Sequence, residues 1–192
     1  MSEPTLHTTT LGGGCFWCLD AVYRGVEGVH ESVAGYAGGH APHPTYADVC
    51  TGTTGHAEVV RLTYDPAVVT FDDLLNVFFS VHDPTTKDRQ GADVGPQYRS
   101  IVLAESDAQA EAARAKIAAL DAEGVFGAAI VTEVERLETF HPAEGHHQNF
   151  FANNPGQGYC AAVIAPKVAA FRARHADLLK PNRATPGSTG GA

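Results

Sequence analysis

The sequence has few cationic side chains and no long apolar run, and these two deficits exclude several classes of protein. Its 192 residues include 13 Lys and Arg against 22 Asp and Glu, a formal net charge of -9. Nucleic acids and anionic membranes need a basic surface, so neither is an expected partner. No apolar run approaches the roughly 20 residues of a membrane-spanning helix. The first residues, MSEPTLHTTT, lack the features of a secretory signal, so we expect a cytoplasmic protein.

Sulfur-containing residues are also scarce. Met1 is the only methionine, and the four cysteines are Cys15, Cys18, Cys50 and Cys160. So low a cysteine density argues against a scaffold held together by disulfides. In a reducing compartment such cysteines are more often catalytic, metal-binding or simply buried, and each of these roles is considered below.

The order of the predicted elements indicates the fold class. Hydrophobic residues make up 44% of the chain, enough for a sizeable core, and no internal repeat is present. The patterns predict strands at 6–11, 29–36, 57–64, 98–104 and 128–137, and helices at 15–24, 71–82, 107–123, 143–153 and 167–179. This mixed order predicts an α+β fold, a two-layer sandwich around a mixed sheet. We assign 1–180 to a single catalytic domain and the Pro-, Gly- and Ser-containing residues 181–192 to a disordered tail.

The strongest local feature is the segment GGGCFWC, which runs from Gly12 to Cys18. A predicted strand leads into three glycines, and Cys15 opens the predicted helix. Free N–H groups and positive partial charge at a helix N-terminus stabilise a thiolate, the reactive form of cysteine. The alternative is that Cys15 fills a tight turn as a small apolar residue, and the local pattern alone leaves both readings open.

Two aromatic residues follow Cys15. Phe16 shares a helical stripe with Leu19 and Tyr23, a spacing that favours packing in the core. Trp17, the only tryptophan, lies off that stripe. It is therefore the better candidate for an apolar wall that receives a methyl or thioether group.

Cys15 and Cys18 also form a C-x-x-C pair, which allows two rival functions. Dithiol–disulfide oxidoreductases use this spacing at the start of a helix. Zinc-binding interaction modules use it too, and His141 and His146 supply a superficial second half. The separation between the two pairs is too long for a compact zinc finger, which disfavours the second rival.

Further candidates lie beside loops. Glu58, at the start of a predicted strand, would donate a proton if it were buried, whereas most glutamates are solvated. Tyr46 and Tyr98 are potential hydrogen-bond donors. Asp93 belongs to a polar cluster of the kind that usually faces solvent. Cys160 has glycines before it that suit a mobile thiol, but the apolar residues after it favour a buried strand.

Several separate segments, taken in order, resemble the A-type peptide methionine sulfoxide reductases. They are GGGCFWC (12–18), GYAGG (35–39), PTYADVCTGTTGHAEVV (44–60), FFSVHDPT (78–85), DRQGADVGPQYRS (88–100), HHQNFF (146–151) and PGQGYCAAVIAPKV (155–168). The similarity covers roughly residues 6–175. It implies an α+β two-layer fold, which we expect to contain a ferredoxin-like core with long loops.

The resemblance also implies roles at the nucleophile. Cys15 matches the nucleophilic cysteine, and Phe16 and Trp17 match the pocket for the substrate methyl group. Cys160 matches the resolving cysteine of relatives that carry GYC near this point. Cys18 remains a rival for that role, disfavoured by the strain of a disulfide within a regular helix.

The remaining implied roles concern the sulfoxide oxygen. Glu58 matches the acid that protonates it, Tyr46 and Tyr98 match its hydrogen-bond donors, and Asp93 matches a supporting acidic residue. At Asp20 many relatives carry Glu, a difference expected to alter contacts at the helix surface.

The implied reaction is the reduction of methionine S-sulfoxide, in oxidised proteins or as the free amino acid, to methionine. A sulfenic acid on Cys15 gives an intramolecular disulfide that thioredoxin then reduces. The resemblance implies neither a metal nor an organic cofactor. We expect the protein to act as a monomer.

Overall fold

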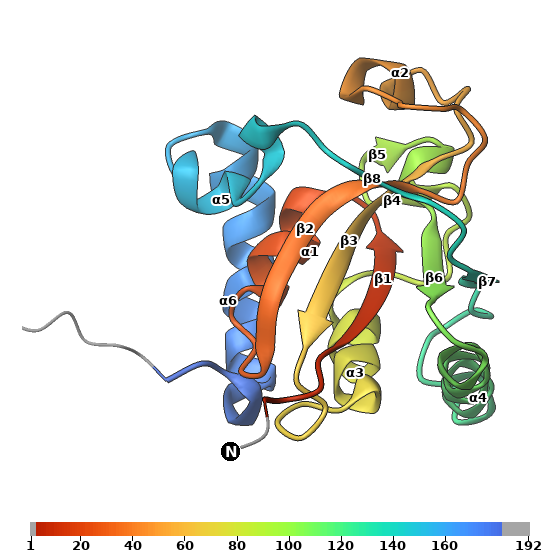
Figure 1. The fold of residues 1–192 in the computed structure, drawn as a ribbon, viewed down its shortest axis with the longest axis vertical. Helices are drawn as coiled ribbons and strands as arrows, with labels where there is room; N and C mark the ends of the chain where they lie inside the picture. The colour runs from red at the N-terminus through yellow and green to blue at the C-terminus, as the bar shows by residue number, and fades with distance from the viewer. Residues whose placement is uncertain (1–2, 182–192) are drawn as a thin grey trace, which may run out of the picture.

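Six strands form one mixed sheet in the computed structural model, which describes residues 3–181 (Figure 1). The strands, in the order β7-β6-β1-β3-β2-β8, are β7 (Glu133–Arg136), β6 (Ser100–Ala104), β1 (His7–Gly13), β3 (Ala57–Tyr64), β2 (Val29–Ala37) and β8 (Phe140–Pro142). Only β6 and β7 pair in parallel. A separate hairpin joins β4 (Arg89–Gln90) to β5 (Asp93–Val94). Apart from residue 181, the predicted tail lies outside the described residues.

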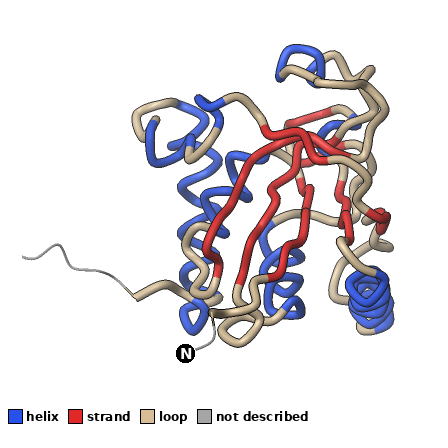
Figure 2. Tube along the Cα trace, viewed as in Figure 1, coloured by secondary structure: helices blue, strands red, loops and turns tan. Residues whose placement is uncertain are grey.

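Helices gather on one side of this sheet, as Figure 2 shows in blue behind the red strands. They are α1 (Phe16–Tyr23) and α3 (Phe71–Val81), with α6 (Ala165–Arg174) packed against both. The longest helix, α4 (Asp107–Ala122), contacts β6 and β7, and α2 (Tyr46–Cys50) and α5 (Phe150–Asn153) are short. No helix among residues 3–181 is long and apolar enough to cross a membrane.

The core lies between the sheet and the helices. The predicted stripe of Phe16, Leu19 and Tyr23 is confirmed, since none of the three is more than 1% exposed. The Tyr23 hydroxyl donates to the Leu74 carbonyl at 2.8 Å, which joins α1 to α3. On the opposite face of the sheet a smaller cluster contains Val59 and Ile101, among others, and packs against the segment before β8.

The predicted α+β class with a mixed sheet is confirmed, but several elements differ from the prediction. The strand expected at 128–137 is only β7, because the backbone before it bonds elsewhere: the Val131 N–H donates to the Pro84 carbonyl at 2.8 Å. The helix expected at 143–153 is split into a 3₁₀ turn, Gly145–His147, and α5. The segment between the strands expected at 29–36 and 57–64, for which no helix was predicted, contains α2.

The strand suggested around Cys160 was wrong. Cys160–Ile164 form a π-helical turn that leads into α6. A short apolar run fits a buried strand and a buried helix equally well, so its periodicity could not separate them. The strand expected at 98–104 begins at Ser100, and Tyr98 ends a 3₁₀ turn instead.

Capping side chains explain where several helices begin. The Thr70 side chain caps α3 by accepting from the Asp73 N–H, in a complete capping box. An equivalent box between Thr45 and Asp48 begins α2. At α4 the box is only half formed, because the Gln109 side chain accepts from the Glu105 N–H rather than from Ser106.

Asp20 is a buried hub, so the expectation that it alters helix-surface contacts was wrong. The residue is 1% exposed. Its carboxylate accepts from Arg24 Nε at 2.9 Å, from Ser32 Oγ at 2.7 Å and from the Asn149 N–H at 3.1 Å. This one side chain therefore joins α1 to β2 and to the segment before α5.

Replacing this hub is expected to destabilise the fold. Asp20→Asn removes the charge opposite Arg24 and leaves buried donors poorly paired, so the free energy of unfolding should fall by about 2 kcal/mol in urea denaturation. The matched control is Asp107→Asn, whose carboxylate pairs with Arg136 at the surface and is 94% exposed. The control should change stability by no more than about 0.5 kcal/mol. Equal effects at both positions would contradict the buried role.

Candidate active site

Cys15 lies at the junction of β1 and α1, where it is the N-cap residue of the helix. Gly14 precedes it with φ 94°, and a Cβ there would lie 2.6 Å from Gln90 Cγ. Glycine is therefore required for the turn that delivers Cys15 to the helix start. Cys15 is 8% exposed, and its carbonyl accepts from the Cys18 N–H at 3.1 Å.

Strand alternation places Glu58 beneath the start of α1. Ala57 and Val59 belong to the cluster on the far face of β3, so the intervening Glu58 points to the helix side. Glu58 Oε1 accepts from the Phe16 N–H at 3.2 Å, and Oε2 is buried without a hydrogen-bond partner among the described residues. Burial raises the pKa of Glu58 to about 8. The carboxyl is therefore mostly protonated at pH 7, with one oxygen free to donate to a ligand.

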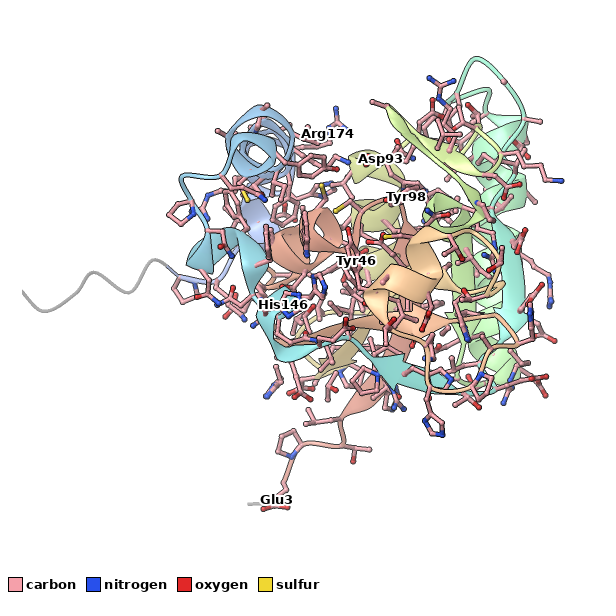
Figure 3. The ribbon with its side chains drawn as sticks, turned by 90° about the horizontal axis from the view of Figure 1, so that it is seen from above. Glu3, Tyr46, Asp93, Tyr98, His146 and Arg174 are labelled. Carbon is pink, nitrogen blue, oxygen red and sulfur yellow. The ribbon has the colours of Figure 1, made fainter. Side chains whose placement is uncertain are left out.

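Two phenols approach the same place. Tyr46 begins α2 and Tyr98 ends its 3₁₀ turn, and Figure 3 shows both lying next to each other, with Asp93 beyond Tyr98. Both tyrosines are half-buried. Burial raises the pKa of each phenol, and the nearby Glu58 raises it further, so both hydroxyls remain protonated and can donate.

An aromatic wall stands beside Cys15. The Trp17 ring stacks on Phe150, with ring centroids 3.8 Å apart, and Trp17 Nε1 donates to His147 Nδ1 at 3.1 Å. The Phe16 ring is fully buried and lies 6.2 Å from Tyr46. Trp17 is only partly buried. The Trp17 and Phe150 rings form an apolar surface suited to a small, weakly polar group, and the buried Phe16 ring lies next to Trp17.

Asp93 and Cys160 approach from other parts of the chain. Asp93, on β5, accepts from the Tyr159 hydroxyl at 2.8 Å. Asp93 and Tyr159 line a cavity of about 110 Å³ together with Cys15 and Cys18. Cys160 is fully buried and packs in one apolar cluster with those two cysteines. The structure thus brings Asp93, Cys18 and Cys160 together around Cys15.

The ionisation of the thiols differs from the expectation for a helix start. Burial raises the pKa of Cys15 well above its ordinary value, and a hydrogen bond to Cys18 and the charge of Glu58 act in the same direction. The expected Cys15 thiolate is therefore not the resting form. The same hydrogen bond lowers the pKa of Cys18 against its burial, and the charge of Lys167 lowers it further. In the resting pair, Cys18 is the more acidic thiol.

Sequence reasoning missed two members of the site. They are Glu144 and His147, and His147 is buried. Glu144 accepts from the Tyr36 hydroxyl at 3.0 Å and from the Tyr46 N–H at 3.1 Å, which fixes the start of α2. The only available signal was the density of polar residues around them. No pattern pointed to Tyr159 or Lys167.

The zinc alternative lacks a ligand set. Across residues 3–181, no group of three or more His, Cys, Asp or Glu side chains is placed to hold a metal ion. His141 lies instead beside His56, with ring centroids 5.2 Å apart.

Comparisons with known proteins point to one family. Residues 7–179 match the family model described as peptide methionine sulfoxide reductase. Proteins named peptide methionine sulfoxide reductase MsrA are 52% identical in Polynucleobacter asymbioticus (94% of this chain, 95% of that protein) and 56% identical in Ralstonia nicotianae (91% and 94%). Mxr1 from Saccharomyces cerevisiae in reduced form superposes with a TM-score of 0.76 at 34% identity, over 83% of this chain and 92% of that one. Mxr1 in complex with Trx2 superposes with a TM-score of 0.55 at 26% identity, over 78% and 88%.

The raised pKa of Glu58 has a consequence for stability. Between the ordinary value of 4.5 and the folded value of about 8, the folded protein holds a proton that the unfolded chain has lost. The stabilisation from that proton is complete below pH 4.5 and is lost as the pH rises towards 8, by about 1.4 kcal/mol per pH unit. Glu58→Gln should lack this slope. Urea denaturation of both proteins from pH 5 to 8 measures it, and parallel pH profiles would contradict the assignment.

Proposed function

The chain belongs to the peptide methionine sulfoxide reductase family, and we propose that it reduces methionine sulfoxide by attack of Cys15 on the sulfoxide sulfur. The observation that carries this proposal is the pairing of a thiol at the helix start with a buried, protonated carboxyl. Glu58 binds the first N–H of α1 through one oxygen and keeps the other free. A sulfoxide sulfur becomes electrophilic when its oxygen is protonated, and such a carboxyl can supply that proton.

We assign the other side chains by their position around these two groups. Tyr46 and Tyr98 donate hydrogen bonds to the sulfoxide oxygen, where negative charge develops. Phe16 and Trp17 form the apolar surface against which the methyl group rests. Asp93 supports the polar side of the site.

The chemistry then proceeds in two stages. Oxygen passes from the methionine sulfur to the sulfur of Cys15, so the sulfoxide is reduced to a thioether and the thiol is oxidised to a sulfenic acid. In the second stage the sulfenic acid condenses with another thiol, with loss of water, to give a disulfide. Cys160 is the resolving cysteine in this proposal, supported by its burial in one cluster with Cys15.

An external dithiol protein reduces that disulfide in the proposed cycle. The family resemblance implies thioredoxin, and the yeast relative Mxr1 forms a complex with Trx2. The substrates proposed are the S-sulfoxides of methionine in proteins and of free methionine. The proposal places the enzyme in the cytoplasm as a monomer, with residues 1–180 acting as one catalytic domain. Within it, the order β1-α1-β2-β3-α3-β6 and the strand order β6-β1-β3-β2 support a ferredoxin-like core.

Cys15→Ser should abolish sulfoxide reduction, because a hydroxyl is a far weaker nucleophile toward sulfur than a thiol. The assay follows methionine formed from a methyl sulfoxide with a dithiol reductant. Cys50→Ser is the matched control, since Cys50 is exposed on α2, and it should retain full activity. Residual turnover of the Cys15 variant would contradict the nucleophile. Reduction of protein disulfides in place of sulfoxides would favour the dithiol oxidoreductase.

Cys160→Ser should separate the two stages of the reaction. The variant retains Cys15 and Glu58, so it should form one equivalent of methionine per chain. Cycling supported by thioredoxin should stop, because the disulfide that thioredoxin reduces does not form. Quantifying methionine in single-turnover and steady-state assays tests this. Persistent cycling would show that Cys160 is dispensable.

A further inference from the structure

We propose that Cys18, beside the positive charge of Lys167, is the first thiol to attack the Cys15 sulfenic acid. Cys160 then attacks the resulting disulfide at Cys18, which moves the disulfide to Cys18 and Cys160. The inference rests on the proposed function and adds an intermediate disulfide to it. It also gives a role to Lys167, a positioning residue that acts through Cys18 and does not contact the sulfoxide.

The geometry of α1 removes the objection to a Cys15–Cys18 disulfide. Strain was expected because both residues were placed inside a regular helix. Cys15 is instead the N-cap, with φ -60° and ψ 124°, so its side chain leaves an extended backbone and only Cys18 is helical. The hydrogen bond between the Cys18 N–H and the Cys15 carbonyl closes a single turn, which brings the two residues within the short Cα separation that a disulfide needs.

The order of the thiols follows from their neighbours. Cys15 and Cys18 line the same cavity and pack in one cluster, and their side chains shift each other's pKa in opposite directions. Burial raises the pKa of the Cys160 thiol and the charge of Cys18 raises it further, and its own hydrogen bond goes to Gln157 Oε1 at 3.6 Å. Cys160 is therefore a weaker first attacker than Cys18, although it packs in the same cluster.

Lys167 supplies the charge that this order requires. It lies on α6, is half-buried and lines the 110 Å³ cavity with Cys15 and Cys18. None of the five ion pairs among residues 3–181 involves Lys167. Its positive charge is thus not neutralised by a carboxylate in direct contact and favours an ionised Cys18, the better nucleophile.

Other charged groups face this position. Asp93 on β5 opposes the ionisation of Cys18. The Tyr159 hydroxyl donates its one hydrogen to Asp93, so it favours a Cys18 thiolate only when that hydrogen turns from Asp93 to Cys18. His82 lies close to Lys167, but burial lowers the pKa of His82 to about 4, so it is neutral near pH 7. Lys167 is therefore the cation that acts on Cys18 in that pH range.

The steps balance in atoms and electrons. As Cys15 attacks the sulfoxide, its proton passes to the Cys18 thiolate, and Glu58 protonates the oxygen as it moves from the methionine sulfur to Cys15. Cys18 then ionises again beside Lys167 and attacks the Cys15 sulfenic acid: an S–S bond forms, the S–O bond breaks, and the hydroxyl takes the proton released by Cys18 and leaves as water. Cys160 next attacks Cys18, which forms the Cys18–Cys160 disulfide, and the Cys160 proton returns Cys15 to a thiol. The external dithiol reduces this last disulfide, and its two protons restore the Cys160 thiol and the Glu58 carboxyl.

The decisive experiment traps the intermediate in Cys160→Ser. The reduced variant is mixed with one equivalent of methyl sulfoxide, quenched over time with an alkylating agent or dimedone, and mapped by mass spectrometry. The relay predicts that one Cys15–Cys18 disulfide forms for each methionine produced. Methionine with a persistent dimedone-reactive Cys15 and an alkylated Cys18 would overturn the relay alone. Absence of methionine would instead overturn the proposed function.

Cys18→Ser supplies the complementary result. The sulfenic acid on Cys15 should accumulate and remain reactive to dimedone, because its first partner is missing. Formation of a Cys15–Cys160 disulfide at the wild-type rate would overturn the relay. The Cys50→Ser protein should behave as wild type throughout.

The role of Lys167 is tested through the pH dependence of disulfide formation. Lys167→Gln should shift this profile to higher pH, because the Cys18 thiolate loses its cation. A shift of about one pKa unit would lower the thiolate fraction tenfold at pH 7, and the greater nucleophilicity of the more basic thiolate would leave a net loss of about threefold. Lys167→Arg should restore the wild-type profile. Lys116→Gln, at a lysine of α4 paired with Asp72, should leave it unchanged. A profile that Lys167→Gln does not shift would overturn the role of the charge.

Discussion

The hydrogen bond from the Phe16 N–H to Glu58 Oε1 is the contact on which the site depends. It fastens the first turn of α1 to β3, and so fixes the distance between Cys15 and a carboxyl that lies 42 residues after Phe16 in the chain. It also occupies one carboxyl oxygen and leaves the other unpartnered. The same contact therefore sets both the geometry of the site and the direction from which a proton can be delivered.

Burial around this contact determines which side chains carry a proton. Desolvation keeps Glu58, Tyr46 and Tyr98 protonated, and it also disfavours a charge on Cys15. In the proposed reaction, the burial that keeps the oxygen-activating groups protonated thus also makes the Cys15 nucleophile less acidic. The pKa of Cys18 is lowered instead, by its interaction with Cys15 and by the charge of Lys167. The helix start alone does not decide which thiol is ionised.

Much of the fold was predictable because its signals are local. The stripe through Leu19 and Tyr23, the cap at Thr70 and the alternation along β3 each depend on neighbours within a few residues. The resemblance added the site residues, which the structure brings together from distant segments. Local patterns could not reveal that Asp20 is a hub or that Lys167 faces Cys18. Those features depend on long-range contacts, as do the thiol pKa values, which respond to burial that only the assembled fold creates.

Trp17 gives the protein an optical reporter of its own. It is the only indole in the chain, and it is stacked on Phe150 and hydrogen-bonded to His147. Every photon emitted by tryptophan therefore originates within the site, from a ring whose excited state is sensitive to nearby sulfur and imidazole groups. The tryptophan emission of the whole molecule is thus the emission of one ring packed against the cluster that contains Cys15, and no label is needed to observe it during turnover.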